Sequence, residues 1–509
     1  MSNKKLKKID LTQSTSPIRE DRLGTVKAFA GKVSDLVKGK HVGGDLAWRE
    51  NKFQQTAGCL LTQTIGRLVT IRDSSLIIHG PVGCSQGTND YREIYQGIPG
   101  KYKLWKKDFE LHALSSNLTE GDIVFGGEKK LRLAIKESIA RYNPKAIIIA
   151  CSCASGVMGD DIDGIVASIQ PEVEPILVPV HCEGFRSQIS QSAFDGSSHA
   201  IARYIVQKPK KRQKDLVGVI APMSVTLGDK IDLVRMFNKI GLRARFIPDF
   251  ATVDELKEIS EAAVIAPTCQ SYGEYLQRAL YENYDTPYFT DPAPLGIENT
   301  KIWFRNIAKY TGKEKEVEQL IKEELDFVTP KLEELKKLFK GKEASIYVSA
   351  GQARAVFIPK FATELGIDVA AVNTLELSPE IVDEFEEVYK EIGDFEIHAS
   401  DYQPFEQSHL LNRLKPDLYT GCIFMGLYKR EGSHVRNHSF LSDFSPQANQ
   451  FFFRGILNYG HILKRALNNP SLNKTLHKKT PSPYKSWWYE QDDIEAYIKQ
   501  KAYSKEKSI

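Results

Sequence analysis

Short apolar runs that alternate with longer amphipathic stretches constrain the fold of this chain more than any other feature. The runs are rich in Val, Ile and Ala and end in Gly, Pro, Ser or Cys, as in Ala146-Ile-Ile-Ile-Ala-Cys151. Parallel strands that are buried on both faces and connected by crossover helices have this pattern. We therefore predict an α/β fold with parallel sheets. The candidate strands are 75–79, 146–151, 176–180, 216–221, 244–247, 262–266, 345–349, 369–372, 395–398 and 417–420.

The strand runs fall into three groups along the chain. A length of 509 residues also predicts about three domains of roughly 150 residues each. We predict three tandem doubly wound, Rossmann-like domains, in which ligands bind at the carboxyl ends of the strands. The predicted boundaries are an N-terminal extension at 1–50, domains at 51–212, 213–342 and 343–478, and a C-terminal arm at 479–509.

Composition excludes several classes of protein. Lys and Arg number 69 against 65 Asp and Glu, and a net charge of +4 gives no reason to expect nucleic acid or a membrane surface as a partner. No stretch reaches the roughly 18 uncharged apolar residues of a membrane-spanning helix. Seven cysteines are sparse and odd in number, which argues against a secreted disulfide framework. We expect a cytoplasmic protein whose thiols are reduced or bind metal.

Three cysteines of the first third lie on strand ends or turn-like segments, namely Cys59, Cys84 and Cys153. Their spacing is not that of a zinc ribbon. The run His79-Gly-Pro-Val-Gly-Cys84 places glycines beside a thiol, so backbone N–H groups can approach an anionic iron-sulfur cluster. The other interpretation is that these are small buried apolar side chains. The glycine pair in 124–128 lacks the Gly-Lys-Ser/Thr ending of a phosphate-binding P-loop.

Several motifs occur in order between Gln54 and Leu476. They are His79-Gly-Pro-Val-Gly-Cys84, Phe125-Gly-Gly-Glu128, Cys153-Ala-Ser-Gly-Val-Met-Gly-Asp-Asp161, Cys182-Glu-Gly-Phe-Arg186, Ser190-Gln-Ser192 and a C-terminal stretch from His438-Ser to Pro470. In this order the motifs resemble the α-type subunit of the catalytic component of nitrogenase and of nitrogenase-like reductases.

The resemblance implies two metal clusters. Cys59, Cys84 and Cys153 match the α-side ligands of a P-cluster-type [8Fe-7S] relay cluster that is shared with a homologous β-type subunit in an α2β2 assembly. Cys269 and His438 match the thiolate and imidazole that hold a large iron-sulfur catalytic cofactor, and both residue types suit such clusters. An ATP-dependent [4Fe-4S] reductase is the implied electron donor, and ATP would bind that partner.

The resemblance also places four residues at the substrate cavity. Arg92 and Arg354 match positive positions beside the cofactor, although domain-interface salt bridges are the alternative for each arginine. Gln191 matches a glutamine of the cavity. Asp195 stands where nitrogenase has a histidine that donates to the cofactor. We expect Gln191 or Asp195 to supply protons, and this substitution predicts a substrate other than dinitrogen.

The function predicted from this resemblance is reduction of a small molecule by a nitrogenase-like reductase. Reductive C–S cleavage of methylthio-alkanes is the favoured reaction. Three alternatives stay open, namely a dinitrogen-reducing α subunit, a scaffold for cofactor assembly and a cluster-free binding module. Scaffold relatives usually lack the histidine that matches His438, so this residue argues against a scaffold. The heterometal stays open, and Cys422 is either an added ligand or a buried strand residue.

Overall fold

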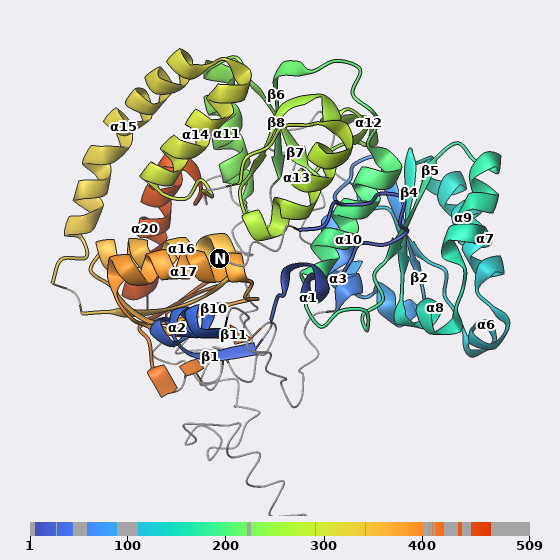
Figure 1. Ribbon diagram of the computed structural model, residues 1–509, viewed down its shortest axis with the longest axis horizontal. Helices are drawn as coiled ribbons and strands as arrows, with labels where there is room; N and C mark the ends of the chain where they lie inside the picture. The colour runs from blue at the N-terminus through green and yellow to red at the C-terminus, as the bar shows by residue number, and fades with distance from the viewer. Residues whose placement is uncertain are drawn as a thin grey trace, which may run out of the picture.

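The structure is a computed structural model, and it describes residues 6–26, 28–43, 59–88, 110–220, 225–290, 292–341, 343–400, 407, 410–411, 413–421, 436–439 and 449–469. In this part of the chain the strands form three sheets of four, three and six strands, and helices flank them (Figure 1). The predicted α/β fold with parallel sheets is confirmed. Each predicted strand run overlaps a strand of the structure.

The first sheet has the strand order β3-β2-β4-β5 and is parallel throughout. Its strands are β2 (Ser74–His79), β3 (Ala113–Ser115), β4 (Ala146–Cys151) and β5 (Ile176–His181). Every residue of β2 and β4 is buried, which explains their uninterrupted apolar runs. Helices α7 (Glu128–Tyr142) and α9 (Ile162–Ile169) cover one face. Helices α3 (Leu60–Leu68) and α10 (Ser192–Ala200) cover the other face.

The second sheet is parallel, with the order β7-β6-β8. It comprises β6 (Gln213–Ile220), β7 (Arg243–Ile247) and β8 (Ala262–Pro267). Gly218 lies in the central strand, where an added Cβ would lie 2.6 Å from Ile265 Cδ1, so a larger residue would require that side chain to shift. The helices that follow these strands include α11 (Leu227–Lys239), α12 (Val253–Lys257), α13 (Gln270–Tyr284) and α14 (Ile297–Thr311).

The third sheet has the order β1-β11-β10-β9-β12-β13. Five of its strands are β9 (Ser345–Ala350), β10 (Asp368–Thr374), β11 (Glu396–Ser400), β12 (Leu418–Gly421) and β13 (Arg436–Ser439), which are mutually parallel. Associated helices are α2 (Val33–Gly43), α16 (Gln352–Glu364), α17 (Pro379–Ile392) and α20 (Phe452–Asn468). The long, highly charged helix α15 (Glu314–Lys337) packs against α20 and joins the second group of strands to the third.

The residues predicted as an N-terminal extension contribute a strand to the third sheet. Strand β1 (Ala28–Lys32) pairs with β11 in an antiparallel register from Ala28 opposite Ser400 to Lys32 opposite Glu396. In Figure 1 this blue strand lies beside the orange strands of the third sheet. A five-residue strand whose partner lies more than 360 residues later leaves no local signal in the sequence.

Residues 6–24, here called the N-terminal arm, lie against the first and second domains before the chain enters β1. His199 on α10 contacts the Gln13 carbonyl oxygen through Nε2 at 2.8 Å, and Asn283 on α13 donates to the Ile9 carbonyl at 3.2 Å. The arm contains the short helix α1 (Arg19–Leu23), which lies between the two halves of the molecule in Figure 1. The arm is therefore packed into the body of the protein.

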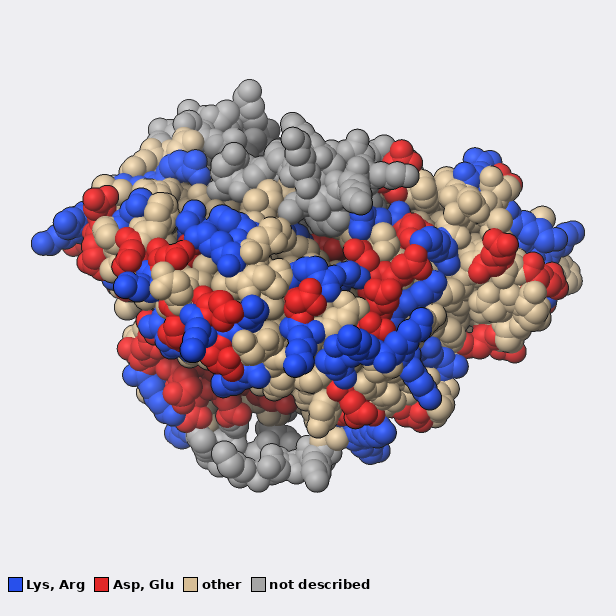
Figure 2. Space-filling view, turned by 90° about the horizontal axis from the view of Figure 1, so that it is seen from above, with Lys and Arg blue, Asp and Glu red and all other residues tan. Residues whose placement is uncertain are grey.

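The charges on the surface and the character of the helices agree with the amino-acid composition. Acidic and basic side chains are interspersed over the face in Figure 2, in keeping with a net charge of +4. In the ranges that the structure describes, the helices all fall short of the length and apolar character that crossing a membrane requires.

Candidate functional site

The three cysteines of the first domain converge at the carboxyl edge of its sheet. Cys59 caps the N-terminus of α3, Cys84 lies in the 3-10 turn Val82–Ser85 after β2, and Cys153 begins α8 (Cys153–Met158) after β4. A Cβ added to Gly184 would lie 3.3 Å from Cys153 Sγ and 3.4 Å from Cys59 Cβ. Burial raises the pKa of the Cys84 thiol, and the nearby thiols of Cys153 and Cys59 raise it further. The structure thus brings together the three residues that the sequence singled out.

Backbone donors surround these sulfur atoms. The Gly184 N–H donates to Cys153 Sγ at 3.1 Å, and the Thr62 N–H donates to Cys59 Sγ at 3.4 Å. Cys59 and Cys153 both lie at helix N-termini, where the helix dipole favours negative charge on sulfur. The site therefore suits thiolate ligands of an iron-sulfur cluster.

A rim of exposed apolar side chains surrounds the thiols. Cys59 and Cys153 are exposed, and we define the apolar rim as Val82, Val157 and Phe185, which are 67, 77 and 61% exposed. Phe185 contacts α8, since a Cβ on Gly156 would lie 3.1 Å from its ring. Exposed apolar side chains that gather in one place mark a contact surface. This face of the first domain is open to a partner.

Cys269 lies at the junction of the domains. It follows β8, caps the N-terminus of α13 and packs against both of the largest core clusters. Burial raises the pKa of its thiol, although the backbone of Ala353 and Tyr272 and the positive charge of Arg354 oppose this rise. Arg354 is buried, and its guanidinium lies 4.8 Å from the centre of the Phe451 ring. Arg354 is thus near the predicted cofactor anchor.

The structure describes only the backbone of His438, the second predicted anchor. His438 lies on β13, with its backbone paired to Thr420 of β12 at the carboxyl end of the third sheet. Its side chain is outside the described part of the structure, as are Arg92 and Cys422. The predicted pairing of Cys269 with His438 therefore stays a prediction.

Gln191 immediately precedes α10 and is buried. Its Oε1 has no hydrogen-bond partner among the described residues, and the same holds for Oε1 of Gln270, the residue after Cys269. A buried acceptor without a partner is costly. Each of these two acceptors therefore has room to accept a hydrogen bond from a further polar group.

Asp195 does not have the surroundings of a proton donor. It is fully buried on α10, with Oδ1 3.0 Å from Arg19 Nη2 and Oδ2 2.6 Å from Arg22 Nη2. Burial alone would raise the pKa of Asp195, but the two guanidinium groups outweigh burial and lower it. A carboxylate held ionised in this way carries no proton to donate at neutral pH. The geometry thus argues against the predicted proton-supplying role of Asp195.

The two arginines of the N-terminal arm connect α10, α13 and the segment after β10. Arg19 pairs with Glu376, which follows β10, and donates to Ser271 Oγ on α13 at 3.0 Å. Arg22 pairs with Glu274 on α13 at 2.6 Å. Arg19 also borders a small cleft beside the predicted cofactor cysteine. Its lining includes Arg19, Gln270, Ser271, Gln352 and Glu376.

Arg19 and Arg22 are not among the predicted site residues, because their segment is predicted to be an N-terminal extension. One local signal was available. The arginines are three residues apart, which places them on one face of a helix, and Gly24 follows that helix as its cap with φ of +64°. Two cations on one face of a short capped helix predict an acidic partner, but they do not identify Asp195.

Comparison with known proteins places most of the chain in one family. A family model described as nitrogenase component 1 type oxidoreductase matches residues 64–438. A nitrogenase iron-molybdenum cofactor biosynthesis protein NifE of Methanosarcina barkeri is 27% identical over 415 residues, which cover 79% of this chain and 86% of that protein. A nitrogenase molybdenum-iron protein alpha chain of Methanothermobacter thermautotrophicus is 26% identical, with 81% and 88% covered.

Solved structures show the same fold. The structure titled nitrogenase Cp1 at pH 5 superposes with a TM-score of 0.70 at 21% identity, and the match covers 89% of this chain and all of that one. The match to nitrogenase Cp1 at pH 6.5 has a TM-score of 0.68.

Proposed function

Because the chain belongs to the family of nitrogenase component 1 type oxidoreductases, we propose that it is the α-type catalytic subunit of a nitrogenase-like reductase. The observation that carries this proposal is the convergence of Cys59, Cys84 and Cys153 at the carboxyl edge of the first sheet, where Cys59 and Cys153 are exposed and lie beside Gly184. Three thiols at one sheet edge, two of which have N–H donors at helix N-termini, suit the donor set of an iron-sulfur cluster. A cluster-free binding module would not need this arrangement.

In this proposal the three cysteines hold one half of a P-cluster-type [8Fe-7S] relay cluster. The apolar rim supports a second protein chain as the source of the remaining ligands, and we propose a homologous β-type subunit in an α2β2 assembly. When bound, the cluster would supply electron transfer from an ATP-dependent [4Fe-4S] reductase. The Gly184 N–H would stabilise the negative charge on the Cys153 sulfur.

Cys269 and His438 would hold the large iron-sulfur catalytic cofactor. When bound, that cofactor would supply the electrons for reduction of a small molecule. Arg354 places positive charge beside Cys269 and would balance the charge of an anionic cluster. Gln191 immediately precedes α10, and its Oε1 accepts no hydrogen bond from the described residues. This oxygen could therefore accept a hydrogen bond from a ligand. Arg92 belongs to this proposal through its place in the sequence alone.

The substrate that we propose is a methylthio-alkane. Its carbon–sulfur bond would be cleaved with two electrons and two protons, which gives methanethiol and a hydrocarbon. The support is that Asp195, which stands where nitrogenase has a histidine, is paired with Arg19 and Arg22 instead of presenting a neutral hydrogen-bond donor. A cavity with a different charge pattern suits a substrate other than dinitrogen.

A scaffold for cofactor assembly is the second candidate function. It is favoured by one observation, namely that a cofactor biosynthesis protein is as similar to this chain, at 27% identity, as a nitrogenase alpha chain is at 26%. His438 distinguishes the two functions. A catalytic subunit needs a second anchor for its cofactor, whereas a scaffold must release the cofactor.

The first experiment is anoxic purification of the protein with its partner, followed by measurement of iron, molybdenum and vanadium per complex. We expect high iron without either heterometal, and methanethiol release from methylthio-alkanes when the ATP-dependent reductase is added. Molybdenum or vanadium at cofactor stoichiometry would instead support dinitrogen reduction. Little iron would contradict both enzymatic assignments.

Two substitutions then separate the two clusters. Cys269→Ala is expected to remove most of the cofactor iron and leave the relay cluster, whereas Cys84→Ala is expected to remove the relay cluster. Cys182→Ala is the matched control, because Cys182 is a buried cysteine at the same sheet edge whose Sγ donates to the Cys151 carbonyl. The two-cluster proposal is wrong if the Cys269 and Cys84 variants keep full iron and activity. His438→Ala should abolish reduction in a catalytic subunit, and a scaffold would still transfer cofactor.

A further inference from the structure

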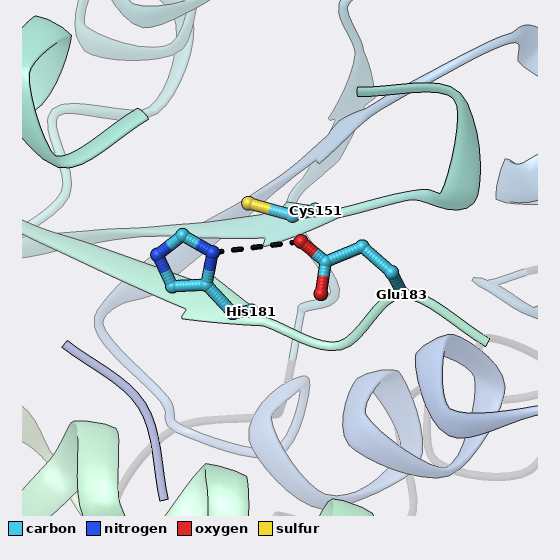
Figure 3. Close-up of side chains that lie close together, drawn as sticks. All are labelled: Cys151, His181 and Glu183. Carbon is cyan, nitrogen blue, oxygen red and sulfur yellow. Dashed lines mark ion pairs between the residues drawn. The ribbon is translucent and has the colours of Figure 1, made fainter. Parts of the chain in front are cut away.

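A second group of possible metal ligands lies at the same edge of the first sheet. Cys151 ends β4, His181 ends β5, and Glu183 follows two residues later (Figure 3). One ligand atom from each lies within 4.8 Å of the others. Cys151 and Glu183 are buried, and His181 is half-buried. This group is separate from Cys59, Cys84 and Cys153, and the proposed function makes no use of it.

The imidazole of His181 is oriented as in a metal site. Its Nδ1 lies 3.5 Å from Glu183 Oε1, as the dashed line in Figure 3 shows, and its Nε2 lies 2.7 Å from Asp163 Oδ2 on α9. Metal-binding histidines usually donate their outer N–H to a carboxylate, which fixes the tautomer and the ring. The Tyr204 hydroxyl donates to Asp163 Oδ1 at 3.2 Å and holds that carboxylate in place.

The distances also fit a tetrahedral ion. Zinc binds histidine nitrogen and carboxylate oxygen at about 2.0–2.2 Å, so two such ligands at a tetrahedral angle are about 3.4 Å apart. The Nδ1 to Oε1 separation of 3.5 Å is close to this value. One sulfur, one nitrogen and one oxygen make a borderline-soft donor set, which suits zinc better than calcium or magnesium.

We propose that Cys151, His181 and Glu183 bind one zinc-class divalent ion through Sγ, Nδ1 and a carboxylate oxygen. The Asp163 carboxylate is the outer partner that orients His181, and water completes the coordination. Binding releases the thiol proton of Cys151 and any proton on Nδ1 of His181. The inference does not depend on the proposed function, because none of these residues is a proposed cluster ligand.

The ion would connect the ends of two strands that carry the relay site. Cys153 follows Cys151 by two residues, and Gly184, whose N–H donates to Cys153 Sγ, follows Glu183. An ion that fixes Cys151 to Glu183 therefore fixes this N–H to sulfur contact. Without metal, the same residues form an ion group in which His181 lies between Asp163 and Glu183.

The test is zinc K-edge X-ray absorption on the full-length protein, because this measurement selects zinc and ignores iron. The protein is dialysed first against zinc and then against a weak chelator. We expect one zinc per chain with one sulfur at about 2.3 Å and nitrogen or oxygen at about 2.0–2.1 Å. Cys151→Ser should remove the sulfur shell. Asp163→Asn keeps all three ligands and should weaken zinc binding about 10–100-fold in a chelator competition.

Cys182→Ser is the matched control and should keep zinc and its sulfur shell. If Cys151→Ser does not fold, His181→Gln provides the same test and should lose one zinc per chain. The proposal is overturned if dialysed wild-type protein holds no zinc. In that case the ion pairs of His181 with Asp163 and Glu183 would alone explain why these side chains lie together. It is also overturned if Cys151→Ser keeps its sulfur shell, because the zinc would then be bound at other thiols.

Discussion

Asp195 and its two arginines combine burial with complementary charge. Both Asp195 and Arg19 are almost completely inaccessible to water. A buried charge is tolerated only when it is paired and hydrogen-bonded. The carboxylate meets these conditions through Arg19 and Arg22, so we interpret Asp195 as the residue that holds the N-terminal arm in the junction of the domains.

Replacing the carboxylate tests this role. Asp195→Asn should lower the free energy of unfolding by about 3 kcal/mol at neutral pH, because two buried guanidinium groups lose a shared partner. The pKa of Asp195 is lowered in the folded protein, so its contribution is complete above its ordinary value of about 3.9 and is lost as the pH falls through the folded-state value. The difference between wild type and variant, measured by urea unfolding, should therefore be constant above about pH 4 and shrink below it.

Asp254→Asn is the control for Asp195→Asn. Asp254 also pairs with lysines and has a lowered pKa, but it is 53% exposed, so we expect a change of at most about 1 kcal/mol. Equal effects of the two substitutions would contradict the assigned role of Asp195.

For single residues, the sequence predicts contacts between neighbouring strand ends but not contacts that depend on the path of a loop or arm. The meeting of Cys84 with Cys153 follows from the rule that the carboxyl ends of neighbouring parallel strands share one edge. Arg19 and Asp195 are separated by 176 residues and belong to no common strand pattern. Their pairing depends on how the arm crosses the junction, and a single sequence does not specify that path.

For helix α15, two substitutions can test whether ion pairs or its apolar face hold it against the neighbouring helices. Glu324 lies on its buried face and accepts from Arg235 on α11 at 2.7 Å and from Arg454 on α20 at 2.8 Å. The neighbouring Glu323 is exposed and pairs with Lys239 at 3.0 Å. The two residues are thus adjacent glutamates on one helix with opposite surroundings.

We expect Glu324→Gln to lower the free energy of unfolding by about 3–5 kcal/mol, because it leaves two arginines without their shared carboxylate. Glu323→Gln should cost about 0–1 kcal/mol, since exposed pairs contribute little. Thermal unfolding followed by circular dichroism compares the two variants. A loss of similar size in both would show that α15 is held by its apolar face alone.

Elements were predictable where the pattern is long and repeated. The buried runs of β4 and β8 and the 24 residues of α15 are such cases. The strands β1, β3 and β13, of three to five residues, were missed. Short edge strands bury little apolar surface, so their position depends on the neighbour to which they pair and not on their own residues.

For the whole molecule, the apolar rim beside the thiols makes a prediction about assembly. Phe185→Asp should reduce the amount of β-type partner that co-purifies with the chain at least tenfold, because it places a charge in a desolvated contact. Leu133→Asp is the matched control, since Leu133 on α7 is 57% exposed against 61% for Phe185 but lies away from the rim. Quantitative pull-down measures both. Unchanged recovery with Phe185→Asp would place the partner elsewhere.

The antiparallel pairing of β1 with β11 sets an order of events during synthesis. Residues 28–32 leave the ribosome long before Glu396–Ser400, their partners in the third sheet. At 5–20 residues per second, the interval is on the order of 20–70 s. Throughout this time the first strand has no edge to join, while the domains between are completed. The chain can therefore bind its early strand only after β11 has been made, and a fusion before β1 has to leave this strand free to reach the third sheet.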